Sequence, residues 1–264
     1  MLEKWSNLLF ELSSDDRLDI LLLLKKSPLK LSHISGKLDF TVQETSRNVT
    51  RLSDARLIRK DSDGAFHLTP YGEEALNLLL GFKFLFKNRE YFMAHSLSEF
   101  PQQFRAGLGI LDSFEFVGNV MVAFRNVEKM IARAEKFVWI LTNQVLASTI
   151  PYLLKEIERG GEFRLLMPKE YMPSNDIRDL VTNPIFAKAS RNRKLESRFL
   201  DRCDVFLCLS EKEVAVLGFP NLESRFDYFG FKSEDEVAVE WSKMLYTFYW
   251  NKGVTQIPDQ LISK

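Results

Sequence analysis

Cysteine and histidine are scarce in this chain, with two cysteines and three histidines among 264 residues. Cys203 and Cys208 stand five residues apart in a run that favours a strand, so their side chains would point to opposite faces. That is poor geometry for a disulfide, and we expect two reduced, buried thiols. With so few ligands of this kind, neither a metal site nor a bound cofactor is expected.

Long apolar runs are also missing. The most apolar run, Ala75 to Phe86, is short and contains Lys83, whereas a helix that crosses a bilayer needs roughly 20 apolar residues. Met1 to Lys4 leads into a polar, charged helix and not into the apolar core of a signal peptide. We therefore expect a soluble, cytoplasmic protein that has no membrane partner.

The chain carries no excess of charge, because Lys+Arg and Asp+Glu both number 36. Zero net charge argues against a general basic coating for nucleic acid, but it does not exclude a local basic patch. Such a patch lies between Gln43 and Lys60, where five basic and two acidic side chains leave three positive charges in excess. A local excess of this kind is the electrostatic footprint of a DNA-contacting segment.

The same segment has a distinct order of predicted elements, from Phe40 to Leu68. A short helix over Leu31 to Leu38 precedes a tight turn, and Thr41 then caps a helix that ends near Ala55. The inward residues of this second helix follow an i, i+4, i+7 spacing: Thr45, Val49 and Leu52. A hairpin follows, pairing residues 57–60 with 65–68 across Asp-Ser-Asp-Gly, in which Asp-Gly favours a tight turn.

The polar face of the second helix and the first strand of the hairpin carry the predicted DNA contacts. Arginine reads guanine and glutamine reads adenine in the major groove, so Arg47 and Gln43 are the candidates for base contacts. Arg51, Arg59 and Lys60 suit phosphates. The full set of predicted DNA-binding residues is Thr41, Gln43, Ser46, Arg47, Thr50, Arg51, Arg59 and Lys60.

Downstream of about Leu111 the pattern changes to short apolar runs that alternate with helical ones, which favours an α/β domain. The predicted strands are 137–141, 163–167, 196–200, 205–209 and 214–219. Predicted helices cover 145–159 and 234–250, and residues 173–193 are predicted to be helical in parts. We expect two domains: residues 1–92, which end in a long apolar helix from Tyr71 to about Met93, and residues 110–252. The helix is either a connector and dimer interface or a core helix within one subunit.

A ligand site in the second domain is indicated by position alone. Pockets of open α/β sheets lie beyond the carboxyl ends of strands. Thr142, Asn143 and Gln144 follow one such end, and Arg198 lies in another predicted strand. These four residues are the candidates for effector binding, although a helix cap at Asn143 and a surface strand charge at Arg198 are the simpler explanations for those two.

The residues from Leu31-Ser32-His33-Ile34 through Leu52-Ser53-Asp54-Ala55-Arg56-Leu57-Ile58 resemble the ArsR/MarR-type winged helix-turn-helix. Thr69-Pro70-Tyr71-Gly72 is similar to the usual exit from the wing in that family. The resemblance covers roughly residues 5 to 90 and implies that Thr41 to Ala55 is the recognition helix. This sequence departs from the family at Arg56, where glycine is usual in a left-handed conformation, so Arg56 implies some backbone strain.

The whole chain resembles archaeal-type transcriptional regulators that have a FilR1-like second domain, related in fold to phospholipase D. The runs that carry this more diffuse resemblance are Phe137 to Thr142, Arg198 to Leu200, Val205 to Leu209 and Glu213 to Val216. The expected fold is therefore an α+β winged helix-turn-helix followed by an α/β, inactive phospholipase-D-like domain.

The prediction of inactivity rests on the histidines. Phospholipase D chemistry needs a histidine nucleophile with a lysine two residues later, because cations must hold the phosphate while histidine attacks. His33, His67 and His95 are followed at that spacing by serine, threonine and leucine. No histidine follows His95, so we expect that the protein is not an enzyme.

The sequence therefore predicts a sequence-specific transcriptional regulator that binds double-stranded DNA as a homodimer and responds to a small-molecule effector in its second domain. Two hypotheses from other classes remain: a phosphodiester-processing enzyme, and a winged helix that binds a protein partner. The basic helix face favours DNA over a protein partner.

Overall fold

The computed structural model describes residues 4–98, 100–145, 147–170, 184–223 and 227–255. The chain divides into two compact units, the first formed by Met1–Phe84 with Ala106–Gly109 and the second by Leu85–Arg105 with Ile110–Lys264. Both units mix helices and strands, which agrees with the broad fold class predicted from sequence. The predicted limits of 1–92 and 110–252 differ from this division, because Leu85–Arg105 belongs to the second unit.

The first unit consists of helices around a small antiparallel sheet with strand order β1-β3-β2. In chain order its elements are α1 (Trp5–Leu12), α2 (Asp15–Lys26), β1 (Leu29–Lys30), α3 (Leu31–Leu38), α4 (Val42–Asp54), β2 (Ile58–Lys60), β3 (Ala65–Leu68) and α5 (Pro70–Lys87). The hairpin register places Ile58 opposite Leu68 and Lys60 opposite Phe66.

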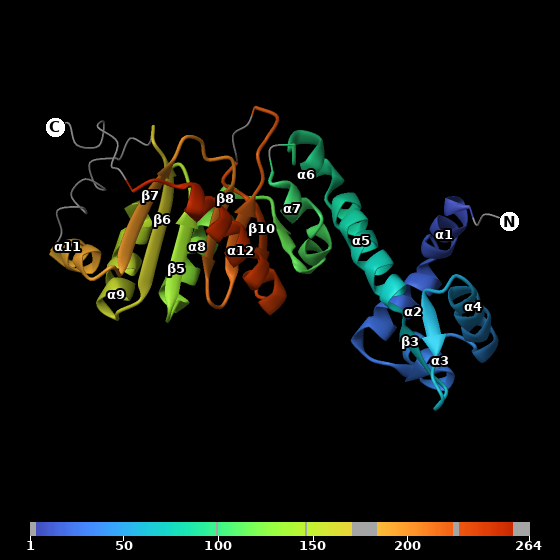
Figure 1. Ribbon diagram of the computed structural model, residues 1–264. Coiled ribbons are helices and arrows are strands. Elements are labelled where there is room, and N and C mark those ends of the chain that lie inside the picture. Colours follow the sequence, from blue (N-terminus) through green and yellow to red (C-terminus); the bar gives the residue numbers. More distant parts are fainter. Residues whose placement is uncertain (1–3, 99, 146, 171–183, 224–226, 256–264) are drawn as a thin grey trace. The chain divides into compact units, whose positions relative to one another are not determined.

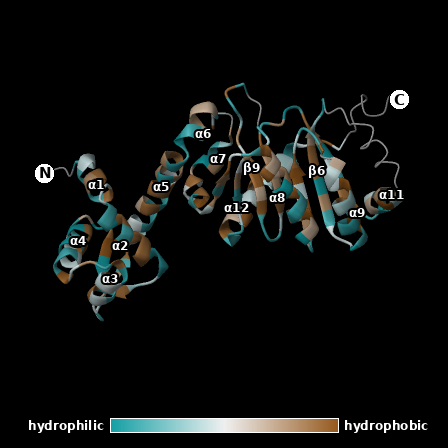
Figure 2. Ribbon diagram, turned by 180° about the vertical axis from the view of Figure 1, so that it is seen from behind, coloured by the Kyte–Doolittle hydropathy of each residue, from teal (hydrophilic) through white to brown (hydrophobic). Residues whose placement is uncertain are grey.

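The amphipathic pattern of α4 sets how this helix packs, and α4 carries both hydrophobic and hydrophilic residues (Figure 2). Thr45, Val49 and Leu52 are buried, as their spacing predicted. Val49 and Leu52 pack into one core with Ile20 and Leu21 of α2 and other apolar residues. Burial of one full aliphatic side chain contributes about 1.5–3 kcal/mol, so this stripe fixes α4 firmly and turns its polar side outward.

The junction after α4 is built from backbone contacts. Arg56 adopts a left-handed conformation with φ of 60°, as the family resemblance implied for this position. The Leu57 amide donates to the Leu52 carbonyl at 3.0 Å. Thr69 then donates through its hydroxyl to the Arg56 carbonyl at 2.7 Å and through its amide to the Leu57 carbonyl at 3.0 Å. A Cβ at Gly72 would lie 1.9 Å from the Leu57 oxygen, so only glycine allows α5 to start this close.

The long apolar helix predicted from Tyr71 to Met93 is two helices. α5 ends at Lys87, Asn88 leaves helical geometry, and α6 (Arg89–Ala94) follows. Within the single chain, only part of the apolar surface of α5 is buried. Leu76, Leu80 and Phe84 are buried, whereas Leu78, Phe82 and Phe86 are 62%, 71% and 71% exposed.

The second unit is a seven-stranded mixed sheet of order β4-β10-β9-β8-β5-β6-β7 (Figure 1). Its strands are β4 (Glu115–Val117), β5 (Phe137–Leu141), β6 (Glu162–Pro168), β7 (Leu195–Leu200), β8 (Phe206–Ser210), β9 (Val214–Gly218) and β10 (Gly230–Ser233). β5, β6 and β7 are parallel, and the pairs from β5 through β8, β9 and β10 to β4 are antiparallel. The five predicted strands correspond to β5–β9, but β4 and β10 were not predicted.

Helices cover both faces of this sheet. The remaining elements are α7 (Gln102–Arg105), η1 (Leu108–Ser113), α8 (Val120–Arg133), η2 (Ala147–Thr149), α9 (Ile150–Glu158), α11 (Pro184–Arg191) and α12 (Glu236–Lys252). Alternation along β5 separates the two faces. Trp139 stacks on Tyr246 of α12 at 5.1 Å, whereas Ile140 lines a pocket with side chains of α8. Of the predicted helical segment 173–193, residues 173–183 lie outside the described residues.

Other expectations concern thiols and membranes. Cys203 and Cys208 are both buried and free, as predicted. Among the described residues, none of the helices has the length and apolar character needed to cross a membrane.

Replacing Arg56 with glycine tests the strain at the helix–hairpin junction. A left-handed conformation costs an L-residue roughly 1–2 kcal/mol, and the greater freedom of glycine in the unfolded chain offsets part of the gain. We expect Arg56→Gly to raise the free energy of unfolding by about 0.5–1 kcal/mol in denaturant titrations. The matched control is Arg56→Ala, which removes the guanidinium but keeps the strain; a gain of equal size in this control would show that charge, not φ, is responsible.

Candidate nucleic-acid interface and pockets of the second unit

A capping box starts α4 and holds its first turn. The Glu44 amide donates to the Thr41 hydroxyl oxygen at 3.2 Å, and the Thr41 amide donates to the Glu44 carboxylate at 3.0 Å. The Thr41 hydroxyl also donates to that carboxylate at 2.7 Å, and these bonds lower the pKa of Glu44. Thr41 was predicted to contact DNA, but its side chain is engaged in holding the helix end.

The outward face of α4 is open to solvent along its length. Four of the predicted DNA-binding residues lie on it, and all are exposed: Gln43, Ser46, Arg47 and Thr50. Positions 43, 46, 47 and 50 follow the spacing of one helix face, so the four side chains form a continuous polar strip. The buried stripe of Thr45, Val49 and Leu52 on the other side holds this strip outward.

Arg51 lies beside the strip but is held by a carboxylate of α1. Its Nη2 and Nε atoms donate to the two Glu11 carboxylate oxygens at 2.7 and 3.0 Å, which is a bidentate pair. Glu11 also contacts Arg17 at 3.1 Å, and the guanidinium of Arg51 lies 5.0 Å from the centre of the Phe10 ring. The Arg51 hydrogen bond lowers the pKa of Glu11, so the predicted phosphate contact of Arg51 competes with an internal ion pair.

The tip of the β2–β3 hairpin is stabilised from inside. The Asp61 carboxylate accepts hydrogen bonds from the amides of Asp63 and Ala65 at 3.0 and 2.8 Å, and its other oxygen lies 2.5 Å from Nε2 of His67. These bonds, the one with His67 first, lower the pKa of Asp61. Arg59 and Lys60 on β2 are both exposed, so the hairpin presents two cations from a fixed backbone.

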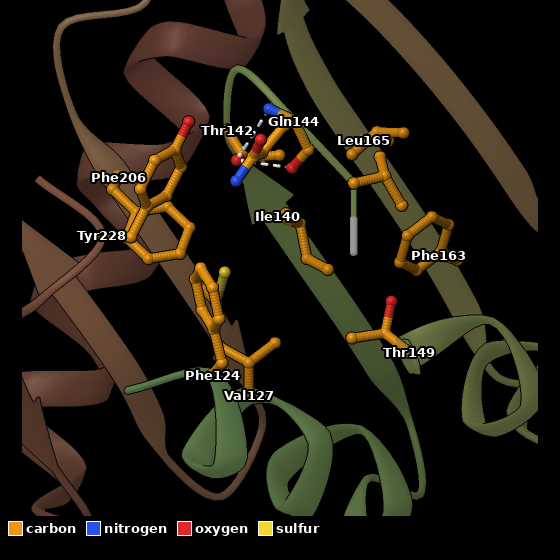
Figure 3. A pocket seen from close by; sticks show the side chains of 12 residues that line it. Phe124, Val127, Ile140, Thr142, Gln144, Thr149, Phe163, Leu165, Phe206 and Tyr228 are labelled. Carbon is orange, nitrogen blue, oxygen red and sulfur yellow. Dashed lines mark hydrogen bonds between the residues drawn. The ribbon is translucent and has the colours of Figure 1, made fainter. Parts of the chain in front are cut away.

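In the second unit, two of the predicted effector residues line a pocket on the α8 side of the sheet (Figure 3). The pocket is almost entirely apolar and encloses only about 20 Å³, close to the space of one water molecule. The Thr142 hydroxyl donates to the Gln144 carbonyl at 2.8 Å, and Asn143 accepts a hydrogen bond from Tyr228 at 2.6 Å. These polar groups are therefore satisfied within the protein.

Arg198 does not join that pocket. It lies on β7 with its guanidinium 4.6 Å from the centre of the Trp250 ring, and it donates to the Trp250 carbonyl at 2.9 Å. Trp250 belongs to α12, which covers the other face of the sheet. The four predicted effector residues therefore lie on two faces and do not form one site.

Sequence reasoning missed two participants in these surfaces. Glu11 stands 40 positions before Arg51, and nothing in the local pattern links them. Tyr228 reaches Asn143 from a loop 85 positions away. Among the described residues, no group of three or more His, Cys, Asp and Glu side chains is placed to hold a metal ion.

Comparisons with known proteins give structural matches only. No family model matches the chain, and no curated protein matches it. TrmBL2, an archaeal chromatin protein whose structure shows a novel mode of DNA binding, matches with 14% identity and a TM-score of 0.42, covering 92% of this chain and 94% of its own. NucT from Helicobacter pylori matches with 14% identity and a TM-score of 0.41, covering 55% of this chain and 98% of its own.

Nuc from Salmonella typhimurium, a phospholipase D family member, matches with 11% identity and a TM-score of 0.37, covering 49% of this chain and 88% of its own. These identities and scores establish no function for this chain. NucT and Nuc nevertheless contradict the sequence-based expectation that the protein is not an enzyme, and that expectation is withdrawn.

Removing the Glu11 carboxylate tests whether α1 is held to α4 by charge. Arg17 is nearly buried, so Glu11→Ala would leave a desolvated cation without its carboxylate partner. We expect the free energy of unfolding to fall by about 1–2 kcal/mol in denaturant titrations. Arg51→Ala should have a smaller effect because Arg51 is 43% exposed, and equal losses in the two variants would contradict the central position given to Glu11.

The same pair predicts a dependence on pH. The pKa of Glu11 is lowered in the folded state from its ordinary 4.5, so its charge stabilises the fold above that value and the stabilisation is lost as pH falls through the lower, folded pKa. The stability difference between the parent and Glu11→Gln should therefore shrink as pH falls below 4.5. A difference that stays constant down to full protonation would contradict a charge-based contact.

Proposed function

We propose that this chain is a DNA-binding transcriptional regulator whose first unit is a winged helix-turn-helix. In this proposal α3 and α4 are the helix-turn-helix, α4 is the recognition helix and the β2–β3 hairpin is the wing. The observation that carries the proposal is the exposed polar strip of α4, formed by Gln43, Ser46, Arg47 and Thr50, on a helix whose opposite side is locked into the core. A helix that is rigid, capped and polar on its free side suits the major groove.

Charge supports the same surface. The strip and β2, the first strand of the hairpin, lie in the segment Gln43 to Lys60, which carries three excess positive charges in a chain of zero net charge. Arg47 has the chemistry to read guanine and Gln43 to read adenine, whereas Arg59 and Lys60 suit backbone phosphates. Arg51 is bound to Glu11, so in this proposal it holds α4 against α1, and a phosphate contact would have to compete with that ion pair.

We propose further that the protein acts as a homodimer. Leu78, Phe82 and Phe86 recur every four residues along α5, and each is more than 60% exposed. Apolar side chains on one helix stripe are usually buried, and contiguous exposed ones mark interaction surfaces. A two-fold dimer would let two recognition helices read a pseudo-palindromic operator, with a small-molecule effector acting through the second unit.

A single substitution on the strip tests the DNA proposal. We expect Arg47→Ala to weaken binding to the DNA upstream of its own gene at least about tenfold, because one good bidentate base contact is worth roughly that much. Fluorescence anisotropy with labelled duplex measures it. Lys188→Ala, which removes an exposed cation from the second unit, is the matched control and should bind like the parent. Unchanged binding by Arg47→Ala would reject α4 as the recognition helix.

The salt dependence of the same titration separates base from phosphate contacts. Each phosphate contact adds about one to the slope of log affinity against log salt concentration. The double variant Arg59→Ala with Lys60→Ala should therefore lower the slope by about two and weaken binding to all sequences alike. A slope equal to that of the parent would remove the hairpin from the interface.

The dimer is tested on α5. We expect Phe82→Ser to shift the protein from dimer to monomer in analytical ultracentrifugation and to leave the free energy of unfolding of the monomer nearly unchanged, since Phe82 is 71% exposed. Glu74→Ser, at an exposed polar position of the same helix, is the control. A parent protein that sediments as a monomer at all concentrations would contradict the proposal.

A further inference from the structure

The second unit contains a cavity much larger than the one at Thr142. It encloses about 470 Å³, which is within the usual range of small-molecule sites. It lies where α8, β4, β9 and β10 meet, beside Val214, the first residue of β9. In the sheet register Val214 pairs with Leu209, near the amino end of β5, so this cavity lies at the opposite end of the sheet from Thr142.

One wall of the cavity consists of hydrogen-bond donors from α8. Asn126, Lys129 and Arg133 are spaced three and four residues apart, so they share one face of the helix. The Asn126 Nδ2 atom is buried and has no hydrogen-bond partner among the described residues. A buried donor without a partner costs roughly 1–3 kcal/mol, and such a group in a cavity wall is available to a ligand.

The facing wall consists of carboxylates at the ends of three strands. Glu115 belongs to β4, Glu213 precedes β9 and Glu234 follows β10. Glu115 is neutralised by Lys232 at 3.1 Å. Glu213 is only 14% exposed, and burial raises its pKa although Arg133 acts in the opposite direction. Glu213 and Glu234 therefore remain as the carboxylates that a cationic group would meet.

Among the described residues, one ion pair joins the two walls, and it is long. Nη1 of Arg133 lies 3.9 Å from a Glu213 carboxylate oxygen, which is longer than a hydrogen-bonded ion pair. The cavity thus holds positive charge on one side and negative charge on the other, across a space large enough for a ligand. Lys129, Arg133 and Lys232 balance Glu115, Glu213 and Glu234, so the lining has no net preference for an anion or a cation.

We propose that this cavity binds a small zwitterion of the α-amino-acid class, with its carboxylate on Asn126, Lys129 and Arg133 and its ammonium group on Glu213 and Glu234. A ligand with only one sign of charge would meet like charges on one wall. This zwitterion would be the effector of the proposed regulator. Only its effect on DNA binding rests on the proposed function. Binding to the isolated protein does not depend on that function.

Free α-amino acids are the ligands to test. The twenty standard amino acids at millimolar concentration, each added separately to the full-length protein, should include at least one that raises the melting temperature through mass action. Calorimetric titration of that amino acid should give one site per chain. Its N-acetyl derivative and its carboxamide, which each lack one charge, should bind at least about tenfold more weakly.

Variants of each wall locate the site. Lys129→Gln with Arg133→Gln and, separately, Glu213→Gln should weaken binding at least about tenfold, whereas Lys155→Gln on the exposed surface of α9 should bind like the parent. The proposal is overturned if no amino acid shifts the melting temperature, or if these variants bind unchanged. It is also overturned if inorganic phosphate or an aliphatic diamine stabilises the protein as much as the best amino acid.

Substitution of Asn126 distinguishes a ligand-binding role from a purely structural one. Asn126→Leu removes the unpartnered donor at nearly constant size, so the melting temperature of the ligand-free protein should rise while affinity for the amino acid falls. A variant that is less stable and binds normally would assign Asn126 to the fold. If an amino acid binds but Arg47→Ala does not alter DNA binding, this inference holds and the proposed function fails. If Arg47→Ala weakens DNA binding but no amino acid binds, the proposed function holds and this inference fails.

Discussion

The close backbone approach between Leu57 and Gly72 determines how the first unit is assembled. The Leu57 carbonyl accepts the Thr69 amide, and the α-carbon of Gly72 lies so near that oxygen that no other residue fits. The Thr69 hydroxyl binds the Arg56 carbonyl and also accepts the Gly72 amide at 2.9 Å. One contact point therefore joins the end of α4, the start of the hairpin and the start of α5, and the buried stripe of α4 turns its polar strip outward from this frame.

Arg56 has the left-handed, strained backbone conformation at this junction. An arginine in a left-handed conformation carries backbone strain that a glycine would not. Either the arginine side chain has a function that offsets this strain, or the fold tolerates it. Arg56 is exposed and adjoins the basic segment of β2. Its charge adds to the field of Arg59 and Lys60, the two hairpin cations of the proposed interface.

Local signals explain what the sequence could predict. The predicted limits of α4 and of the hairpin agree with the structure to within one residue. The capping box of Thr41 and Glu44, the spacing of Thr45, Val49 and Leu52, and the Asp63-Gly64 turn are signals that each act within a few residues. The apolar runs of β5–β9 were equally visible. β4 and β10 were missed because each is short and lies at or next to the sheet edge. The two strands also pair with each other across 113 or more positions, as in the pairing of Gly230 with Val117.

The site residues also divide into those that local sequence signals predict and those that depend on distant partners. The exposed strip of α4 was predictable, since a helix with three inward residues turns the others outward. The role of Arg51 was not, because its partner Glu11 belongs to another helix. The effector residues were placed by the rule for parallel sheets, but β8, β9 and β10 are antiparallel, so the larger cavity opens at the other end of the sheet.

The contrast between the two cavities follows from where polar groups find partners. At Thr142 the hydroxyl binds Gln144 and Asn143 binds Tyr228, so a ligand entering there would have to break bonds already made. At α8 the Asn126 donor is buried without a hydrogen-bond partner among the residues that the structure describes, and Arg133 and Glu213 approach across the cavity only to 3.9 Å. A ligand that joins those walls would gain contacts that the free protein lacks. Such a ligand alters DNA binding only if it favours one conformation of the chain over another, so an effector at this cavity requires that the distance between α8 and the strand ends differ between the two states.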